Sequence, residues 1–299
     1  MRLAITHETR YSYSPAVQTA QHVAHLQPAD TPCQKVLSHS LHVEPAASVL
    51  HNVDAYCNHR AYWALNNPHD GLLVRACSEI ETSDIEQAKA TQSWESVREH
   101  FRYHGGLPAD VNNGFVFGSH HAPVHEAFTA YAQSSFTPGR ALMPAALELT
   151  ARMHRDFTYA SQSTDINTPA LEALESKRGV CQDFAHILLA CLRSLGLPAR
   201  YVSGYLLTQP PPGQPRLVGS DASHAWASVY LPELASHACQ GWLDLDPTNN
   251  RCGLASPGLD YVRLAVGRDF ADVSPLRGVL QGGGEHTLDV AVTVAPLDE

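Results

Sequence analysis

The spacing of apolar residues changes twice along the chain, and this limits the folds that the chain can adopt. Up to about residue 85, apolar and polar residues alternate in short runs, which is typical of β-strands. From about residue 93 to 195 the apolar spacing becomes helical, and beyond this it returns to strand-like runs. Helices followed by consecutive strands predict an α+β domain, preceded here by a small N-terminal β-domain.

Within this pattern, individual helices and strands can be placed. Helical spacing predicts one helix over residues 93–103 and a longer one over 141–157. Thr168 and Pro169 predict the N-cap and the first turn of a short helix. A further helix is expected over 181–195, because a glycine follows it directly and a proline comes soon after. Strand-like runs follow at 200–206, 222–231 and 241–245.

The length of the chain and its turn-forming clusters suggest where domains begin and end. At 299 residues the chain is long enough for one large or two ordinary domains, which usually span roughly 100–200 residues each. Clusters rich in Asn, Asp, Gly and Pro separate the first strands from one another. We therefore expect an N-terminal β-domain over 1–85, a helical linker region over 86–140 and an α+β domain over 141–299.

The charge and hydropathy of the chain argue against several kinds of partner. The formal net charge is −10, and Lys and Arg form no run that would follow a phosphate backbone. We therefore expect neither nucleic acid nor a membrane surface as a partner. The first 20 residues are too polar for the core of a signal peptide, and no window approaches ~18 uninterrupted apolar residues. The sequence thus predicts a cytoplasmic protein.

Cysteine and histidine are numerous enough that disulfides and metal sites must be considered. The chain has 7 cysteines, an odd number, and no Cys-x-x-Cys pair, which argues against a disulfide framework and against a thiolate zinc site. It also has 18 histidines, but the zinc-binding pattern His-Glu-x-x-His is absent. The adjacent pair His120 and His121 lies in a loop that contains proline. We expect no metal and no cofactor.

The segment Arg178–His186 places a cysteine where a nucleophile would be activated. Gly179 predicts a turn that delivers Cys181 to the first turn of an apolar helix. The free N–H groups and the dipole at this end of a helix favour a thiolate over a thiol, and a nucleophile needs the thiolate. A single cysteine is more often a small buried apolar residue, and this is what we expect of Cys191 in the middle of the same helix.

A thiolate nucleophile also needs a general base, which is best supplied by a histidine that a carboxylate holds in one tautomer. Alternation places His224 on one face of the strand 223–230 and Asp246 on one face of the strand 242–247. If the two strands pair antiparallel, these side chains become neighbours at the open end. Asp244 would lie roughly 6–7 Å nearer the hairpin turn, so Asp246 is the better orienting carboxylate. Taken singly, each residue also fits a structural role, as a core histidine and as a turn-forming Asp-Pro.

Several ordered segments of the chain resemble bacterial transglutaminase-like proteins. Four of them match the core of that family, one near the C-terminus matches the same subfamily, and a group of residues matches its start. The core segments are Arg178–His186, Leu195–Tyr205, His224–Trp226 and Asp246–Asn249. The others are Gly267–Gly278, the residues His7, Thr9, Tyr11 and Tyr13 before Leu26–Pro28, and Asp54 before Asn58. The resemblance therefore covers nearly the whole chain.

The resemblance implies a fold and a set of catalytic roles. The fold is a papain-like, transglutaminase-like α+β core, with helices packed on an antiparallel sheet, preceded by the N-terminal β-domain. The roles are those of a catalytic triad, with Cys181 as nucleophile, His224 as base and then acid, and Asp246 as the residue that orients the histidine. One position departs from the subfamily, because Cys57 stands where a glycine is usual. This puts a local turn in doubt and leaves the chemistry untouched.

Such a triad would make the chain a cysteine peptidase or amidohydrolase that acts on a peptide or protein substrate. The thiolate would attack an amide or isopeptide carbonyl and leave a thioester acyl-enzyme. Water would complete a hydrolysis, whereas an amine would complete a transamidation, and sequence does not separate the two outcomes. A binding module that keeps the fold without catalysis is a further alternative, but such a relative would be expected to have lost a member of the triad. Substrate identity, oligomeric state and the role of the N-terminal domain stay open.

Further positions around the triad are assigned as oxyanion or substrate contacts. The backbone N–H of Cys181 is the natural first donor to the oxyanion. For the second donor Tyr159 is chosen over Gln182, which is very close in sequence, and a core position is the alternative for Tyr159. Asp183 is interpreted as a helix cap or a substrate contact, because a carboxylate this close would oppose a thiolate. Trp226 is expected to form a wall of the cleft, with core packing as the alternative.

Overall fold

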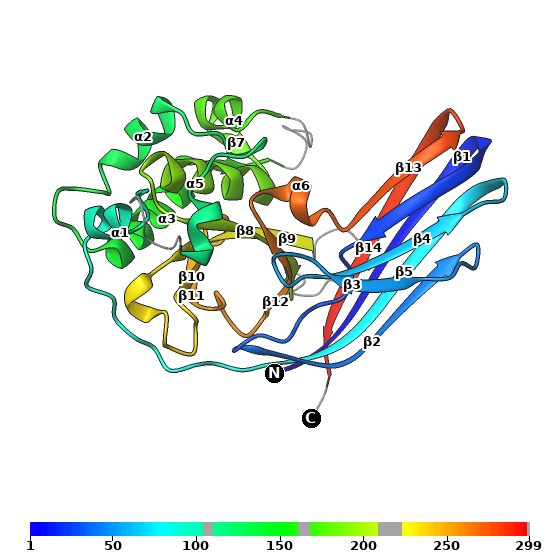
Figure 1. Ribbon diagram of the computed structural model, residues 1–299, viewed down its shortest axis with the longest axis horizontal. Helices are drawn as coiled ribbons and strands as arrows, with labels where there is room; N and C mark the ends of the chain where they lie inside the picture. The colour runs from blue at the N-terminus through cyan, green and yellow to red at the C-terminus, as the bar shows by residue number, and fades with distance from the viewer. Residues whose placement is uncertain (104–109, 161–167, 209–222, 298–299) are drawn as a thin grey trace, which may run out of the picture.

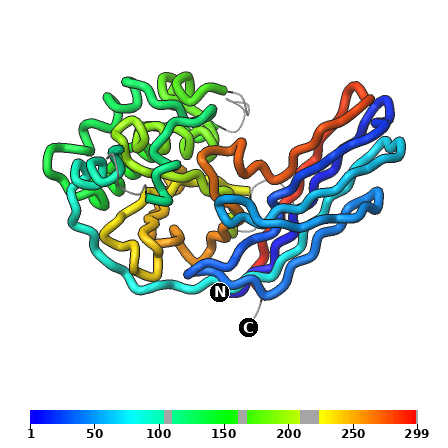
Figure 2. Tube along the Cα trace, viewed as in Figure 1, coloured from blue at the N-terminus to red at the C-terminus, as the bar shows by residue number. Residues whose placement is uncertain are grey.

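The computed structural model describes residues 1–103, 110–160, 168–208 and 223–297, which form two parts that lie side by side (Figures 1 and 2). One part is a sheet of long strands, and the other is a shorter sheet with helices packed against it. Neighbouring strands in both sheets pair antiparallel. The predicted α+β class with an N-terminal β part is therefore confirmed.

The first sheet is built around one long strand, β1 (Arg2–Ala24). On one side β1 pairs with β5 (His69–Thr82) and β4 (His59–Leu65), and outside these lie β2 (Gln34–Glu44) and β3 (Leu50–Val53). Buried and more exposed positions alternate along β1, as the period-2 pattern of the sequence requires. The strand-like runs that were expected before about residue 85 lie within this sheet.

The other edge of β1 is covered by the C-terminal end of the chain. β13 (Leu276–Gly282) pairs with the second half of β1, and β14 (Glu285–Pro296) pairs with the first half. β13 and β14 therefore belong to the sheet of the N-terminal part, although they follow the second sheet in the chain. The first sheet thus combines residues from two of the expected domains, 1–85 and 141–299. Local periodicity identifies a strand but not its partner, so the sequence alone gave no sign of this return.

The second sheet carries the strands that follow the long apolar helix. Its strand order is β11-β10-β9-β8-β12, so β9 lies between β10 and β8. The strands are β8 (Ala199–Leu206), β9 (Ser223–Tyr230), β10 (Trp242–Asp246), β11 (Arg251–Leu254) and β12 (Tyr261–Gly267). Almost every residue of β8, β9 and β10 is buried, which agrees with a sheet that is covered on both faces.

Helices cover this sheet, and one of them lies at the centre of the core. α5 (Cys181–Ser194) is buried continuously from Asp183 to Arg193 and packs against β8, β9, α2 and α4. A helix that is apolar on nearly all sides belongs inside a core, and α5 sits there (Figure 1). The remaining helices are α1 (Trp94–His100), α2 (Glu126–Gln133), α3 (Leu142–Asp156), α4 (Ala170–Ser176) and α6 (Phe270–Val273). In the described part of the chain no helix is both long and apolar enough to cross a membrane.

The predicted helices agree with the structure except at two points. The helices expected over 93–103, 141–157 and 181–195 are α1, α3 and α5, each ending within a few residues of the expected place. Pro169 is itself the N-cap of α4 and Ala170 is the first helical residue, which corrects the assignment of Thr168 as the cap. α2 was missed, because it is only 8 residues long and has few apolar positions to reveal a period. The start of the predicted strand 222–231 lies outside the described residues.

The turn placed in doubt by Cys57 is formed. Cys57 has φ 65°, in the left-handed region that favours glycine, which gives a physical reason for a glycine at this position in the subfamily. Asp54 holds the turn, since its Oδ1 accepts hydrogen bonds from the backbone N–H groups of Tyr56 and Asn58 at 2.8 and 2.9 Å. The left-handed conformation is therefore retained despite the Cβ of cysteine.

Candidate active site

The N-terminus of α5 presents Cys181 at the first helical position. The N-cap is Val180, whose backbone N–H donates to Asp183 Oδ2 over 2.8 Å. Asp183 is buried and caps the helix, so of the two roles considered for it the structure shows the cap. Gly179 makes room for this contact, because a Cβ at that position would lie 2.6 Å from Asp183 Oδ2.

A methyl group at Gly179 should therefore loosen the cap. We expect Gly179→Ala to lower the free energy of unfolding by about 1–3 kcal/mol, since it displaces a buried carboxylate from its backbone donor. Gly114→Ala is the matched control, because a Cβ at Gly114 meets nothing within 4 Å. Urea denaturation of both variants measures the difference. Equal stability of the two would show that the cap tolerates a side chain at this turn.

His224 and Asp246 are brought together by the pairing of β9 with β10. The antiparallel register sets Leu245 opposite Ala227, so the end of β10 lies beside the start of β9. His224 Nε2 donates to Asp246 Oδ2 over 2.7 Å, as the strand pattern predicted. Asp244 lies elsewhere, where its carboxylate accepts hydrogen bonds from Trp226 Nε1 and Ser228 Oγ.

Asp246 is fully buried and held by several donors. Besides the imidazole, its Oδ2 accepts from the Tyr261 hydroxyl at 2.7 Å and from Asn249 Nδ2 at 2.8 Å. Its Oδ1 accepts from the backbone N–H groups of Thr248 and Asn249. Burial alone would raise the pKa of this carboxyl, but the hydrogen bond and charge of His224, with the other donors, outweigh burial and lower the pKa. The carboxylate is thus ionised and fixed in position.

His224 lies between this carboxylate and the thiol. Burial alone would lower the pKa of the imidazole, but its hydrogen bonds to Asp246 and to Cys181, with their charges, raise the pKa to about 10. Because Asp246 takes Nε2, Nδ1 is the ring nitrogen left for the sulfur. The imidazole is therefore protonated at neutral pH and can stabilise a thiolate at Cys181.

Cys181 and His224 line one cavity with a volume of about 110 Å³. Gln182 also lines it, as does Phe270 of α6. Sequence reasoning did not identify Phe270 as part of the site, although it lies in the segment 267–278 that carried the C-terminal resemblance. The other lining residues are Tyr201, Ser203, Gly204, Tyr205, Ser223, Ala225, Leu264 and Pro275.

Trp226 and Tyr159, which were also predicted as contacts, are not among the residues that line this cavity. Trp226 is 1% exposed and stacks behind the His224 ring, with the ring centroids 6.1 Å apart, so its expected place in the cleft wall is corrected to a place in the core. Tyr159 is half-exposed in the short strand β6 (Thr158–Tyr159), which runs beside β7 (Arg178–Gly179). Of the described residues that line the cavity, Gln182 is thus the one predicted as an oxyanion or substrate contact.

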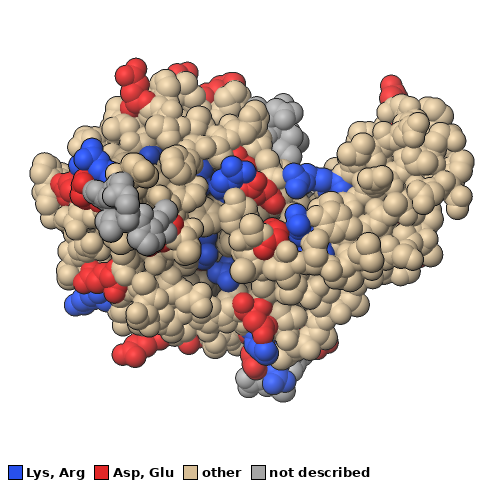
Figure 3. Space-filling model, in the orientation of Figure 1, with Lys and Arg blue, Asp and Glu red and all other residues tan. Residues whose placement is uncertain are grey.

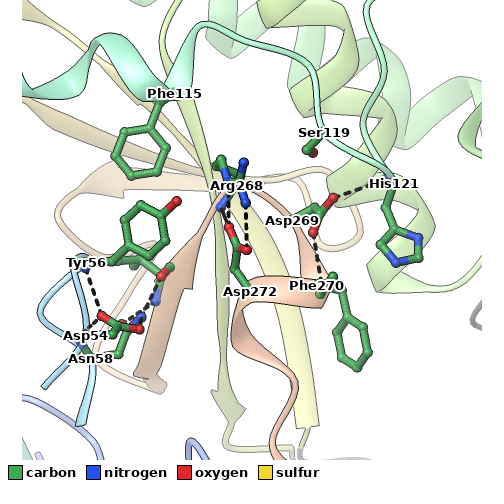
Figure 4. Close-up of polar contacts among 12 residues, drawn as sticks. Asp54, Tyr56, Asn58, Phe115, Ser119, His121, Arg268, Asp269, Phe270 and Asp272 are labelled. Atoms are coloured by element: carbon green, nitrogen blue, oxygen red, sulfur yellow. Dashed lines mark hydrogen bonds and ion pairs between the residues drawn. The ribbon is translucent and has the colours of Figure 1, made fainter. Parts of the chain in front are cut away.

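A polar network holds α6 and its phenylalanine in place (Figure 4). Asp269 caps α6 through Ala271 N–H and also accepts from His121 N–H at 2.9 Å. Arg268 donates to Asp272 at 2.9 Å, and the buried Arg193 donates to the Arg268 carbonyl. These contacts fix the segment from which Phe270 reaches the cavity.

Two protein-family models match this chain, one in each part of the structure. Residues 129–247 match the family model of the transglutaminase-like superfamily, and residues 3–81 match that of the bacterial transglutaminase-like N-terminal region. An uncharacterized protein of Mycobacterium tuberculosis is 38% identical over 99% of this chain and 93% of its own length. An uncharacterized protein of Mycobacterium leprae is 29% identical over 99% of both chains.

One solved structure matches over the whole fold. A Cytophaga hutchinsonii protein, provisionally described as a cysteine protease, has a TM-score of 0.76 and covers 100% of this chain and 91% of its own, at 22% identity. A protein-glutamine gamma-glutamyltransferase of Pseudomonas aeruginosa is 32% identical, over 32% of this chain and 14% of its own length. The expected core fold and its N-terminal β part are therefore confirmed.

Proposed function

The chain belongs to the transglutaminase-like superfamily, and on this basis we propose that it is a cysteine peptidase or amidohydrolase that cleaves an amide bond in a peptide or protein substrate. One observation carries the proposal: His224 is hydrogen-bonded to the buried Asp246 and lines the same cavity as Cys181. Cysteine, histidine and carboxylate in this order of contact form the arrangement that activates a thiol nucleophile.

Acylation follows from the protonation states of the pair. The Cys181 thiolate attacks the amide carbonyl, and a C–S bond forms while the carbonyl oxygen takes the negative charge. The His224 imidazolium then donates its proton to the amide nitrogen, the C–N bond breaks, and the amine leaves. Asp246 keeps the ring oriented and stabilises its positive charge throughout. A thioester to Cys181 remains.

Deacylation decides the product. With His224 as base, water attacks the thioester, the C–S bond breaks and a carboxylic acid is released. An amine that reached the thioester first would form a new amide with the same three residues, which is the transglutaminase-type alternative. For the oxyanion, the Cys181 N–H at the start of α5 is the first donor, and we assign the second to Gln182 because it lines the cavity.

Selective alkylation at pH 6 tests the activated thiol. His224 keeps its proton below its pKa of about 10 and loses it only as pH rises through that value, so the imidazolium is present at pH 6. Iodoacetamide should then label Cys181 at least about tenfold faster than the exposed Cys57, because an ordinary thiol is almost fully protonated at this pH. Mapping of the alkylated peptides by mass spectrometry gives the rates.

Other cysteines of the chain act as internal controls. Burial raises the pKa of Cys33 to about 11 and that of Cys252 to about 12, and it raises the pKa of Cys191 as well, so these should stay unlabelled. His224→Ala should slow labelling of Cys181 and leave that of Cys57 unchanged. Equal labelling rates of Cys181 and Cys57 would count against an activated pair. So would a labelling rate of Cys181 that His224→Ala does not change.

A further inference from the structure

The N-terminal sheet contains a second and much larger cavity. Its volume is about 1020 Å³, and it is bounded by β1, β4 and β13 and by the turns at 45–48 and 66–68. Leu50 and Val279 line it and are 71% and 78% exposed, so the cavity reaches the surface. The visible face of this part of the molecule carries few charged side chains (Figure 3). Arg277 is the one Lys, Arg, Asp or Glu among the described residues that line the cavity.

Several buried polar atoms of this cavity lack a partner. His22 and Trp63 are each 4% exposed and His69 is 7% exposed, and all three line the cavity. Among the described residues, both ring nitrogens of His22, Trp63 Nε1 and His69 Nε2 have no hydrogen-bond partner. A buried polar atom left unsatisfied costs free energy, and native cores seldom contain several such atoms together. Their common position points to a ligand that supplies the missing hydrogen bonds.

The sheet leaves room for the His22 ring between its two neighbouring strands. His22 pairs with Trp63 across β1 and β4, and the two rings stack with centroids 5.3 Å apart. On the other side His22 pairs with Gly278 of β13, where a Cβ would lie 2.6 Å from the His22 ring. The glycine therefore leaves space for the imidazole, which a larger residue would displace.

One short segment joins this cavity to the site of Cys181. Phe270 and Pro275 line the smaller cavity, and Arg277 and Val279 line the larger one. Pro275 and Arg277 are two residues apart, which in extended backbone is about 7 Å. The end of β1 fixes the segment, because the His25 N–H donates to the Pro275 carbonyl over 3.0 Å. The two cavities thus lie along one stretch of chain.

We propose that the larger cavity is a second binding site for the substrate, which holds an uncharged, extended segment of the peptide or protein whose amide enters the Cys181 cavity. The choice of a peptide rests on the proposed function. A peptide group offers a carbonyl to the Trp63 N–H and an N–H to an imidazole nitrogen. Burial lowers the pKa of His22 to about 4, so this imidazole is neutral at pH 7 and can accept as well as donate.

Binding to a catalytically silent chain tests the site without any turnover. Fluorescein-labelled β-casein, an unfolded protein, is titrated with full-length Cys181→Ala, and anisotropy is measured. Adding Trp63→Phe keeps an aromatic ring but removes the N–H, and we expect about fivefold to tenfold weaker binding. Adding Val279→Asp puts a charge on the exposed rim, with little effect on folding, and should weaken binding similarly. The matched control is Val111→Asp, which changes a valine that is 93% exposed and is not among the lining residues.

Each outcome decides the proposal. Equal affinity of the Trp63→Phe, Val279→Asp and Val111→Asp chains for casein would overturn it. A second result would also overturn it: the chain does not bind casein, but it binds chitohexaose in calorimetry, and Trp63→Phe weakens that binding. The cavity would then be a saccharide site.

Turnover separates this proposal from the proposed function. In the chain with Cys181 intact, Trp63→Phe should raise KM for casein about fivefold and leave the rate on the short substrate benzyloxycarbonyl-Gln-Gly unchanged. Casein binding that responds to Trp63→Phe, in a protein that turns over neither substrate, would refute the enzyme and keep the binding site. A loss of rate on both substrates would mean that Trp63 supports the fold and not the binding of casein.

Discussion

Cys181→Ala should abolish turnover of amide substrates, with a fall in kcat/KM of at least about 10³-fold. No thioester can form without the sulfur, and neither His224 nor Asp246 can take its place as a nucleophile. The assay follows release of the amine from a peptide amide, with and without an added primary amine. A carboxylic acid product identifies hydrolysis, whereas a new amide identifies transfer.

The same substitution should leave the fold intact. Cys181 is only partly buried, so the loss of its side chain should change the free energy of unfolding by less than about 1 kcal/mol. Cys57→Ser is the matched control, because Cys57 is exposed and does not line the cavity, and its activity should equal that of the unmodified protein. Substantial activity in Cys181→Ala would refute the assignment of the nucleophile.

Asp246→Ala should lower both activity and stability. We expect kcat/KM to fall by about 10²–10⁴-fold, because His224 loses the carboxylate that orients its ring and stabilises its charge. The free energy of unfolding should fall by about 3 kcal/mol, because the Tyr261 hydroxyl, Asn249 Nδ2 and the Thr248 N–H lose a buried acceptor. Steady-state kinetics and urea denaturation measure the two effects.

The stability effect should also depend on pH with a definite sign. The folded protein lowers the pKa of Asp246, so its carboxylate contributes stability above the ordinary carboxyl pKa of about 4. That contribution is lost as pH falls through the folded pKa. The stability difference between the unmodified protein and Asp246→Ala should therefore shrink below about pH 4. A difference that stayed constant down to acid pH would show that ionisation of Asp246 adds nothing to folding.

Asp244→Asn separates catalysis from folding on the same strand. Asp244 is as deeply buried as Asp246 and accepts hydrogen bonds from Trp226 and Ser228, but it does not contact His224. We expect this variant to lose stability while its kcat/KM stays within about tenfold of the unmodified protein. If both aspartate variants lost activity equally, the effect of Asp246→Ala would reflect the core and not the histidine.

The position of the candidate triad was readable from the sequence because each of its parts rests on local geometry. A glycine before an apolar helix placed Cys181 at a helix N-terminus, and α5 begins there. Alternation along two strands, with antiparallel pairing, predicted that His224 would meet Asp246 and not Asp244, and the hydrogen bond has this form. Side-chain direction along a strand repeats every second residue, so a correct pairing fixes which side chains become neighbours.

The tertiary structure alone decided what surrounds these residues. It placed Trp226 behind the histidine ring instead of in the cleft, and it brought Phe270 to the cavity from a helix of only 4 residues. It also returned β13 and β14 to the first sheet, where Gly278 opens space beside His22. A local pattern fixes the type of an element and the face that it buries. Which distant segment covers that face depends on the packing of the whole chain, and no window of sequence records it.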